Sequence, residues 1–392
     1  MFVGITNTPR DYAWGARGAI SELLGAEPTG APEAELWLGA HPASPSRFVN
    51  PSQAGGATDL AAWIAADPES ALGAGRTRLP FLLKVLAAAS PLSLQAHPTA
   101  QQAIAGFARE HADGIPLAAP DRNYKDAYPK PEIIYALADG FEALCGFRPI
   151  AQTHAIIARL IELDVVDPES DRGPLHRWLN ETAPGSGLRP GFEWIIAKGT
   201  GVRELVARVA AIARANPEEF PVVVTLADGF PGDPGIVISL MLNQVTLSRG
   251  EALYLPAGNI HAYLKGVGIE LMTASDNVLR GGLTPKHVDV TELMDVLDFT
   301  PVPLPHLAGE QLTDAVTLFA PPDVDFTLLV VTGDASIPLS GPAIIICEDG
   351  EFVVAGAVGE QSISTGQLFY VTPAEGELVF AGSGTAFVAT SA

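Results

Sequence analysis

A series of short β-type runs constrains the fold of this chain more than any other feature. Evenly spaced short strands are typical of a β-sandwich or a β-barrel. Glu348-Asp349-Gly350 has the composition of a hairpin turn between two of the runs. No GxGxxG or P-loop sequence follows any strand, which disfavours a nucleotide-binding βαβ fold. After residue 320 the runs, separated by turn-forming residues, are Phe326–Val331, Ala343–Cys347, Phe352–Val354, Gln367–Val371 and Leu378–Phe380.

The middle of the chain changes to a helical period. Ala155–Leu163 and Val202–Ala215 carry apolar residues at i, i+3 and i+4, which predicts amphipathic helices. Residues 1–150 together with 221–300 are therefore expected to form one β domain, 151–220 a helical insert, and 301–392 a second β domain. The predicted class is mainly β with a helical insert. Other predicted elements are strands at Gln244–Leu247, Ala252–Leu255 and Gly268–Met272 and a short helix at Val290–Leu297.

One further helix is predicted at Thr99–Glu110. Thr99 and Gln102 have the spacing of a capping box, in which each side chain bonds the other residue's backbone. Helical spacing places three residues on one apolar face, which is expected to be the buried one: Ile104, Phe107 and Ala108.

Charge excludes one large class of partner. The 392 residues include 23 Lys+Arg and 45 Asp+Glu, a net charge of −22, and no Lys or Arg follows Lys286. Nucleic-acid binding needs a dense basic face, so it is not expected. Intrinsic disorder is not expected either, because 47% of the residues are apolar.

Cysteine usage and hydropathy point to the cytoplasm. Cys145 and Cys347 form no CxxC pair, and two thiols in a chain of this length indicate a reducing compartment. Met1–Asp11 lacks the basic and apolar regions of a signal peptide. No apolar run reaches about 18 residues, so no membrane span is expected. The expected oligomeric state is a monomer.

Two segments offer paired polar side chains. In the sequence LSLQAHP, Gln95 and His97 are two residues apart, so a strand would direct both to one face, where they could bind one metal ion. The alternative is a polar strand face that ends at Pro98. In YKDAYPKPE, Glu132 opens an apolar run, and a buried carboxylate needs a partner, which a metal ion or Lys130 could supply.

Two later segments add candidate residues. His261 follows a Pro-Ala-Gly-Asn turn between two β runs, where it could be a metal ligand or a hydrogen-bonded turn residue. The segment Gly268–Lys286 is a surface loop with an ion pair or one wall of an anion-binding site, and its charged residues include Glu270, Asp276, Arg280 and Lys286. Together with Gln95, His97 and Glu132, His261 would complete a mixed nitrogen and oxygen ligand set that suits zinc.

At this point the sequence resembles the type I phosphomannose isomerase family, which comprises cupin-type zinc enzymes. The resemblance lies in SLQAHP, YKDxxxKPE, the PGDPG of residues 231–235, YLPAGNIHAYL and IELMTASDNVLRGGLTPK, all in the family's order. The N-terminal sequences YAWG and ELWLGAHP are also similar. No such segment lies in the last third of the chain, which matches the family only in being β-rich.

The resemblance implies a cupin or jelly-roll catalytic domain that binds one Zn²⁺ per chain and a small sugar phosphate as substrate. It implies a catalytic role for Arg280 and places Lys130, Ser93, Lys286 and Trp14 at the substrate. His41 is expected to lie outside the metal site. Many bacterial members have His before the Lys-Pro-Glu of the second segment, whereas this chain has Pro129, which cannot act as a base. The implied zinc ligands are Gln95, His97, Glu132 and His261.

The implied reaction is the reversible isomerisation of mannose 6-phosphate and fructose 6-phosphate through a cis-enediol. Glu270 is the first candidate for the base that moves the proton, and Asp276 is the second. One alternative is another cupin metal-dependent sugar-phosphate isomerase. The other is a cupin that binds a sugar phosphate without catalysis.

Overall fold

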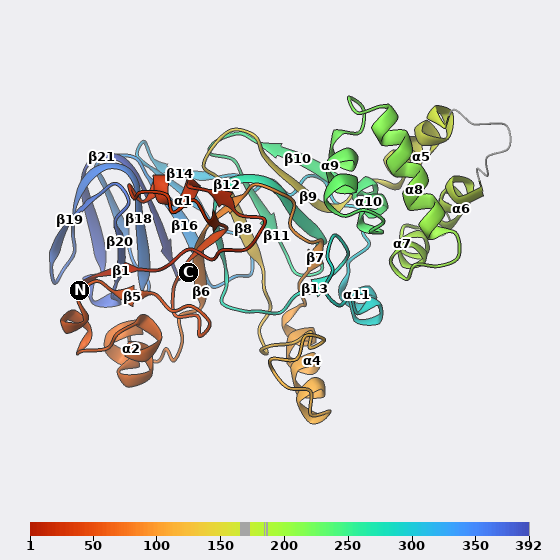
Figure 1. Cartoon of the computed structure of the whole chain (residues 1–392). Helices are drawn as coiled ribbons and strands as arrows, with labels where there is room; N and C mark the ends of the chain where they lie inside the picture. The colour runs from red at the N-terminus through yellow and green to blue at the C-terminus, as the bar shows by residue number, and fades with distance from the viewer. Residues whose placement is uncertain (165–172, 184, 186, 392) are drawn as a thin grey trace.

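Two large antiparallel sheets and a group of helices make up the protein, as a computed structural model shows (Figure 1). The structure describes residues 1–164, 173–183, 185 and 187–391. The helical group lies at one end of the molecule and the sheet of C-terminal strands at the other, with the second sheet between them. The prediction of a mainly β chain with a helical insert is confirmed.

The central sheet has nine strands, and the long strand β12 (His261–Thr273) is its spine. The first half of β12 pairs with β7 and β9, and its second half pairs with β6 and β8. Segments from three distant parts of the sequence therefore meet on one strand. The other strands are β4 (Glu35–Leu38), β6 (Phe81–Ala88), β7 (Gln95–Ala96), β8 (Glu132–Ala136), β9 (Phe141–Phe147), β10 (Leu242–Leu247), β11 (Ala252–Leu255) and β13 (Leu279–Arg280).

The ten-stranded sheet combines the C-terminal strands with the start of the chain. Strand β1 pairs with β20, and β5 pairs with β1, so the N-terminal segment extends this sheet. The strands are β1 (Phe2–Thr6), β5 (Arg47–Phe48), β14 (Glu310–Thr313), β15 (Val316–Phe319), β16 (Thr327–Val331), β17 (Ala335–Pro338), β18 (Ala343–Ala355), β19 (Glu360–Ser364), β20 (Leu368–Val371) and β21 (Glu377–Thr390). A separate pair is formed by β2 (Ala16–Arg17) and β3 (Pro32–Glu33).

The two sheets pack together through a shared apolar core. On β12, Ile269 and Leu271 face this core, and the ring of Tyr135 from β8 packs edge-to-face on Phe387 from β21 at 5.2 Å. Alternation along the strands turns Glu270 to the opposite face of the central sheet. That opposite face carries the polar residues of the candidate site.

The helices between β9 and β10 pack around an apolar core that they share with one end of the central sheet, and this core includes Trp178, Phe192 and Leu205. They are α5 (Ile150–Leu163), α6 (Gly173–Glu181), α7 (Arg189–Ile196), α8 (Val202–Ala215), α9 (Pro221–Gly229) and α10 (Gly235–Ile238), followed by the 3₁₀ helix η2 (Ser239–Met241). The remaining helices are α1 (Ala19–Leu23), η1 (Pro51–Ala54), α2 (Leu60–Ala66), α3 (Pro68–Leu72), α4 (Ala100–Ala112), α11 (Val290–Val296) and η3 (Pro373–Glu375).

Helix α4 confirms its predicted capping box but not its predicted buried face. The Thr99 side chain accepts from the Gln102 backbone, and the Gln102 side chain accepts from the Thr99 backbone. The buried residues are Ala103, Gly106 and Glu110, whereas Ile104 is 58% exposed. The small residues face inward because the ring of Tyr124 packs directly against Gly106. The predicted apolar face was therefore wrong.

The predicted hairpin at Glu348–Gly350 is also wrong. Strand β18 continues through these residues from Ala343 to Ala355 and pairs with β21 along its length. The register shifts between Cys347 and Asp349, which marks a β-bulge, and Gly350 has a φ of 80°. Gly350 therefore supplies the positive φ that this β-bulge needs, and no turn forms at this position.

Replacement of Gly350 by alanine is expected to destabilise the fold by about 3 kcal/mol, because the backbone is left-handed and a Cβ would collide with the Ser383 carbonyl oxygen. Gly55 is a matched control, since its backbone is left-handed, with a φ of 63° and a ψ of 18°, but a Cβ there meets no atom within 4 Å. Gly55→Ala should cost only about 1 kcal/mol, the backbone contribution alone. Urea unfolding measures both, and equal losses would contradict the bulge.

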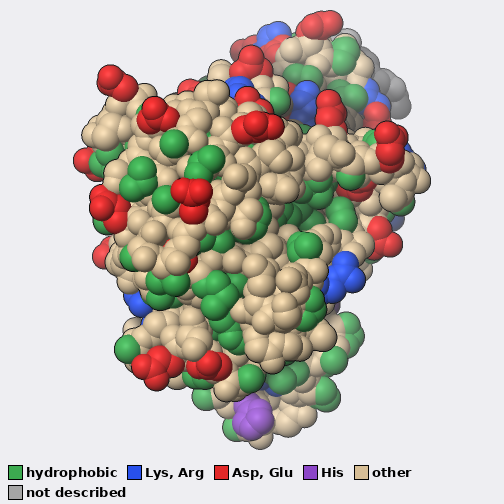
Figure 2. Space-filling view, turned by 90° about the vertical axis from the view of Figure 1, so that its left-hand side faces the viewer, with side chains coloured by type: hydrophobic (Ala, Val, Ile, Leu, Met, Phe, Trp, Pro, Cys, Tyr) green, Lys and Arg blue, Asp and Glu red, His purple; other side chains and the backbone are tan. Residues whose placement is uncertain are grey.

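The acidic excess appears on the surface formed by the C-terminal strands. Figure 2 shows acidic side chains scattered over that face of the molecule and few basic ones. These acidic side chains lie at the end of the molecule opposite the helical group. Within the described residues, no helix combines the length and the hydropathy that crossing a bilayer requires.

Candidate metal centre and active site

Three neighbouring strands place one polar residue each in a single row. His261 of β12 is the register partner of Gln95 on β7, and Gln95 is the register partner of Arg280 on β13. Residues directly opposite each other in an antiparallel pair extend from the same face. The row joins residues that are far apart in the sequence, and it lies at the end of β12 nearest the helical group.

A β-bulge brings His261 to the same face as Glu270. The two residues are nine positions apart, so a regular strand would direct them to opposite faces. The pairing of β12 with β9 shifts register between Tyr263 and Lys265, and the extra residue reverses the alternation. The Tyr263 hydroxyl consequently lies beside the carboxyl of Glu270.

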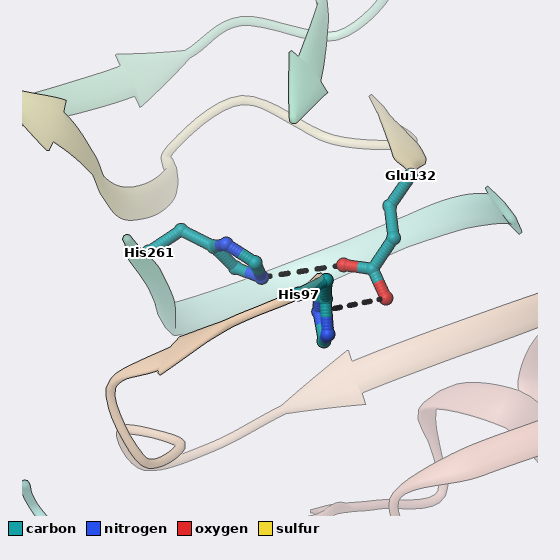
Figure 3. Close-up of side chains that lie close together, drawn as sticks. All are labelled: His97, Glu132 and His261. Atoms are coloured by element: carbon teal, nitrogen blue, oxygen red, sulfur yellow. Dashed lines mark ion pairs between the residues drawn. The ribbon is translucent and has the colours of Figure 1, made fainter. Parts of the chain in front are cut away.

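Three buried side chains converge on a point that could hold a metal ion. One ligand atom from each of His97, Glu132 and His261 lies within 4.8 Å of the others, and each residue is about 1% exposed. Figure 3 shows the carboxylate of Glu132 facing both imidazoles, with one oxygen directed at each. Its oxygens lie 3.5 Å from His97 Nε2 and 3.2 Å from His261 Nε2. The side-chain amide nitrogen of Gln95 lies 3.3 Å from His261 Nε2, so Gln95 borders this group.

The charges of this group suit a divalent cation. Burial and the neighbouring ammonium of Lys130 lower the pKa of His97 to about 4, so its imidazole is neutral at pH 7 and can donate a lone pair. Burial opposes ionisation of Glu132, but Lys130 and His97 hold its pKa well below the ordinary value. Glu132 Oε2 is buried and accepts no hydrogen bond. An anionic oxygen beside two imidazole nitrogens is a donor set that suits zinc.

Lys130 is the partner of Glu132 in this structure. Its ammonium contacts Glu132 Oε1 and lies 3.5 Å from His97 Nε2. Of the two partners that the sequence allowed for Glu132, the lysine is thus in contact, and a metal ion would compete with it for the same carboxylate.

Acidification is expected to destabilise the metal-free protein between about pH 6.5 and pH 4. The pKa of His97 is about 4 in the folded chain against an ordinary value of 6.5, so the unfolded chain binds the proton more tightly. The free energy of unfolding therefore rises with pH through this window, and the contribution is complete above it. Urea unfolding in the presence of a chelator measures the slope. His97→Gln should flatten it, and an unchanged slope would contradict this account.

Backbone carbonyl groups orient both imidazoles. His97 Nδ1 donates to the carbonyl oxygen of Asn277 at 2.7 Å, and His261 Nδ1 donates to that of Asn259 at 3.2 Å. A histidine whose Nδ1 carries the proton presents Nε2 as the ligand atom. Both Nε2 atoms face Glu132, as a common metal ion requires.

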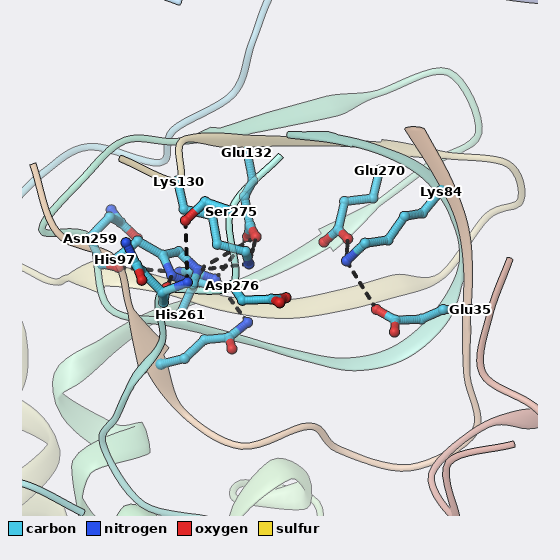
Figure 4. A network of polar contacts seen from close by, with 12 residues as sticks. Glu35, Lys84, His97, Lys130, Glu132, Asn259, His261, Glu270, Ser275 and Asp276 are labelled. Atoms are coloured by element: carbon cyan, nitrogen blue, oxygen red, sulfur yellow. Dashed lines mark hydrogen bonds and ion pairs between the residues drawn. The ribbon is translucent and has the colours of Figure 1, made fainter. Parts of the chain in front are cut away.

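The sequence analysis missed a chain of buried charges next to this centre. Lys84 Nζ lies 2.8 Å from Glu270 and 3.3 Å from Glu35, and the three residues form a line beside Glu132 (Figure 4). Burial opposes the charge of Lys84, but the two carboxylates outweigh it and raise its pKa. Burial raises the pKa of Glu270 despite Lys84. A lysine inside the apolar run FLLKVLAA was the signal that could have identified Lys84.

The predicted cations of the substrate pocket lie together. Burial lowers the pKa of Arg280, and partial burial together with the charge of Arg280 lowers the pKa of Lys286. In the part of the chain that the structure describes, neither residue forms an ion pair with a carboxylate. Two cations without counter-ions can bind an anion such as a phosphate.

The other predicted site residues, Ser93, Trp14 and Asp276, lie in different environments. Ser93 is half-buried and precedes β7. Trp14 stacks on Tyr12 at 5.8 Å and packs against the core that includes Tyr263. Asp276 is held by His41, whose Nε2 lies 3.2 Å away. Partial burial opposes ionisation of Asp276, but His41 together with the charges of Lys130 and Lys84 lowers its pKa. His41 is accordingly not in the His97–Glu132–His261 group.

Comparisons with known proteins agree with the geometry. Residues 2–150 match the family described as phosphomannose isomerase type I, catalytic domain. The mannose-6-phosphate isomerase of Escherichia coli is 34% identical over 97% of this chain and 97% of its own. The mannose-6-phosphate isomerase of Homo sapiens is 34% identical over 82% of this chain and 79% of its own.

Solved structures are similar over the whole length. A single-substitution variant of phosphomannose isomerase from Salmonella typhimurium superposes with a TM-score of 0.88 at 32% identity, covering 100% of this chain and 99% of the other. A mannose 6-phosphate isomerase bound with zinc and yttrium has a TM-score of 0.86 at 31% identity, with the same coverage. On this evidence the chain belongs to the type I phosphomannose isomerase family.

Proposed function

We propose that the protein catalyses the reversible isomerisation of D-mannose 6-phosphate to D-fructose 6-phosphate with one bound Zn²⁺. The observation that carries this proposal is the buried group of His97, Glu132 and His261, in a chain 34% identical over 97% of its length to a mannose-6-phosphate isomerase. The net charge of −22 does not argue against a phosphate substrate, because Arg280 and Lys286 lie together beside the centre.

Zinc would be held by Gln95, His97, Glu132 and His261. The unsatisfied oxygen of Glu132 and the two Nε2 atoms that face it fit this ion. When bound, zinc supplies a Lewis acid that stabilises negative charge on a substrate oxygen.

The protein's own residues would supply binding and proton transfer. The reaction moves a proton from C2 of the aldose to C1, and the base that removes it returns it to the adjacent carbon. Glu270 is the proposed base, because burial raises the pKa of its carboxyl, which makes it a stronger proton acceptor than an exposed carboxylate. Asp276 is the second candidate, but its pKa is lowered by His41, which makes it the weaker proton acceptor.

Cations would stabilise the oxygens of the enediolate and bind the phosphate. We assign the enediolate to Arg280, which extends from the same face as Gln95, with Lys130 nearby. The phosphate is assigned to Ser93 and Lys286. Trp14 is assigned to the wall of the substrate pocket.

The location, the oligomeric state and the domain division of the protein are proposed as well. The protein would be a cytoplasmic monomer, and its two cysteines, Cys145 and Cys347, are free and buried. The domain division remains residues 1–150 with 221–300, 151–220, and 301–392. Cell fractionation and light scattering test the location and the oligomeric state, and a dimer in solution would contradict the latter.

The decisive experiment is a coupled assay for fructose 6-phosphate formation together with metal analysis of the purified protein. We expect turnover that depends on one equivalent of zinc. Zinc without turnover would indicate a binding protein, and iron or manganese in its place would indicate a different isomerase. Reaction in deuterated water should introduce deuterium at the carbon that accepts the proton to the extent that the proton on the base exchanges with solvent, and such incorporation would exclude hydride transfer.

A further inference from the structure

Asn277 is a buried polar residue whose side chain is fully used. It is 0% exposed. Its Oδ1 accepts from the backbone N–H groups of Lys125 at 2.7 Å and Asp126 at 3.2 Å. Its Nδ2 donates to the carbonyl oxygens of Asp126 and Tyr128, both at 2.9 Å, and to the Asp126 carboxylate at 3.2 Å. The side chain therefore clamps the loop 125–128 to the segment after β12.

The backbone of the same residue contacts the metal centre. The Asn277 carbonyl oxygen accepts from His97 Nδ1 at 2.7 Å, the shorter of the two contacts that orient an imidazole. The position of this carbonyl depends on the segment that carries it, and the clamp holds that segment in place. The clamp thus acts on the imidazole without touching the ligand atom.

The Asp126 carboxylate bonds from the loop 125–128 back to the segment that carries Asn277. It accepts from Ser275 Oγ at 2.8 Å and from the backbone N–H of Asp276 at 2.9 Å, so the two residues just before Asn277 are held as well. Arg280 follows three residues after Asn277 on the same segment. A shift of this segment would therefore displace the acceptor of His97 and the approach to Arg280 together.

We propose that Asn277 is a positioning residue for the metal centre: by joining the loop 125–128 to its own segment, it fixes the carbonyl that orients His97. The inference rests on the proposed zinc site and deepens it. Asn277 touches no ligand atom and is not a catalytic residue. The contacts that tie a metal-binding histidine in place commonly change metal affinity by about 10–100-fold.

Asn277→Ala is the principal test. The variant would lose every hydrogen bond that the Asn277 side chain makes, so we expect zinc affinity to fall by about 10–100-fold in competition with a chromogenic chelator. Cobalt(II) in place of zinc should give a visible absorption spectrum with altered band positions, which reports the ligand geometry directly. Affinity and spectrum both unchanged from the unsubstituted protein would overturn the proposal.

Asn123→Ala is the matched control. Asn123 is an asparagine in the preceding turn whose Nδ2 donates to Asp289 at 2.9 Å, and it has no bond to the Asn277 segment. It should keep the zinc affinity and the cobalt spectrum of the unsubstituted protein. Equal losses in both variants would indicate a general loosening of the turn and would also overturn the proposal.

A second variant covers the case in which Asn277→Ala does not fold. Asp126→Ala removes the clamp from the loop side and leaves Asn277 in place, so a smaller loss of zinc affinity with the same spectral change is expected. No loss would contradict the proposal. If the unsubstituted protein itself binds no zinc, the proposed function fails, whereas zinc binding that is insensitive to both substitutions refutes only the role of Asn277.

Discussion

Replacement of His261 by alanine is expected to remove bound zinc and to lower kcat/KM by about 10³-fold or more, since metal stabilisation of the transition state is worth several kcal/mol. His261 is 1% exposed, and its Nε2 lies 3.2 Å from Glu132 and 3.3 Å from the Gln95 amide. Loss of this side chain leaves two of the three convergent groups and a buried carboxylate with one partner fewer. Metal analysis by mass spectrometry and the coupled assay measure the two effects.

His41→Ala is the control for this prediction. His41 is buried as His261 is, but it contacts Asp276 instead of Glu132. We expect this variant to retain one equivalent of zinc, whatever its turnover. Full zinc content and full turnover in His261→Ala would show that the metal lies elsewhere.

Replacement of Glu270 by glutamine is expected to reduce both stability and turnover. Lys84 would lose its nearer carboxylate, at 2.8 Å, and removal of one partner of a buried ion pair costs about 3 kcal/mol. As the base that moves the proton, Glu270 would in addition contribute about 10²–10⁴-fold to kcat. Urea unfolding measures the first effect, and initial rates at a temperature where the variant is folded measure the second.

Glu35→Gln distinguishes a loss of stability from a loss of turnover. Glu35 contacts the same lysine at 3.3 Å, so its loss should also reduce stability, but it lies on β4 at the far side of Lys84 from β12. We expect kcat to remain within a few-fold of the unsubstituted value. If Glu270→Gln kept near-normal kcat, or if the two variants lost turnover equally, the base would have to be another group.

Local elements and the types of ligand residues could be predicted from the sequence because they depend on short-range patterns. Apolar spacing located helix α8 at Val202–Ala215 and strand β11 at Ala252–Leu255, and the capping box located the start of α4. His97, Glu132 and His261 were found through the segments that contain them, and the structure brings them together. The same short-range rules failed at Glu348–Gly350, where a bulge and a turn have the same local composition.

Residue types and their spacing indicate which side chains could do the chemistry: two histidines, a glutamate and a glutamine of zinc-binding type, and cations in an otherwise acidic chain. How these side chains face one another depends on the three-dimensional fold. The bulge between Tyr263 and Lys265 turns His261 to the side of Glu270, and pairing across β12 seats Lys84 on that glutamate. The reason is physical: side-chain direction depends on register with strands distant in the sequence, and backbone carbonyls such as that of Asn277 have no signature in the sequence at all.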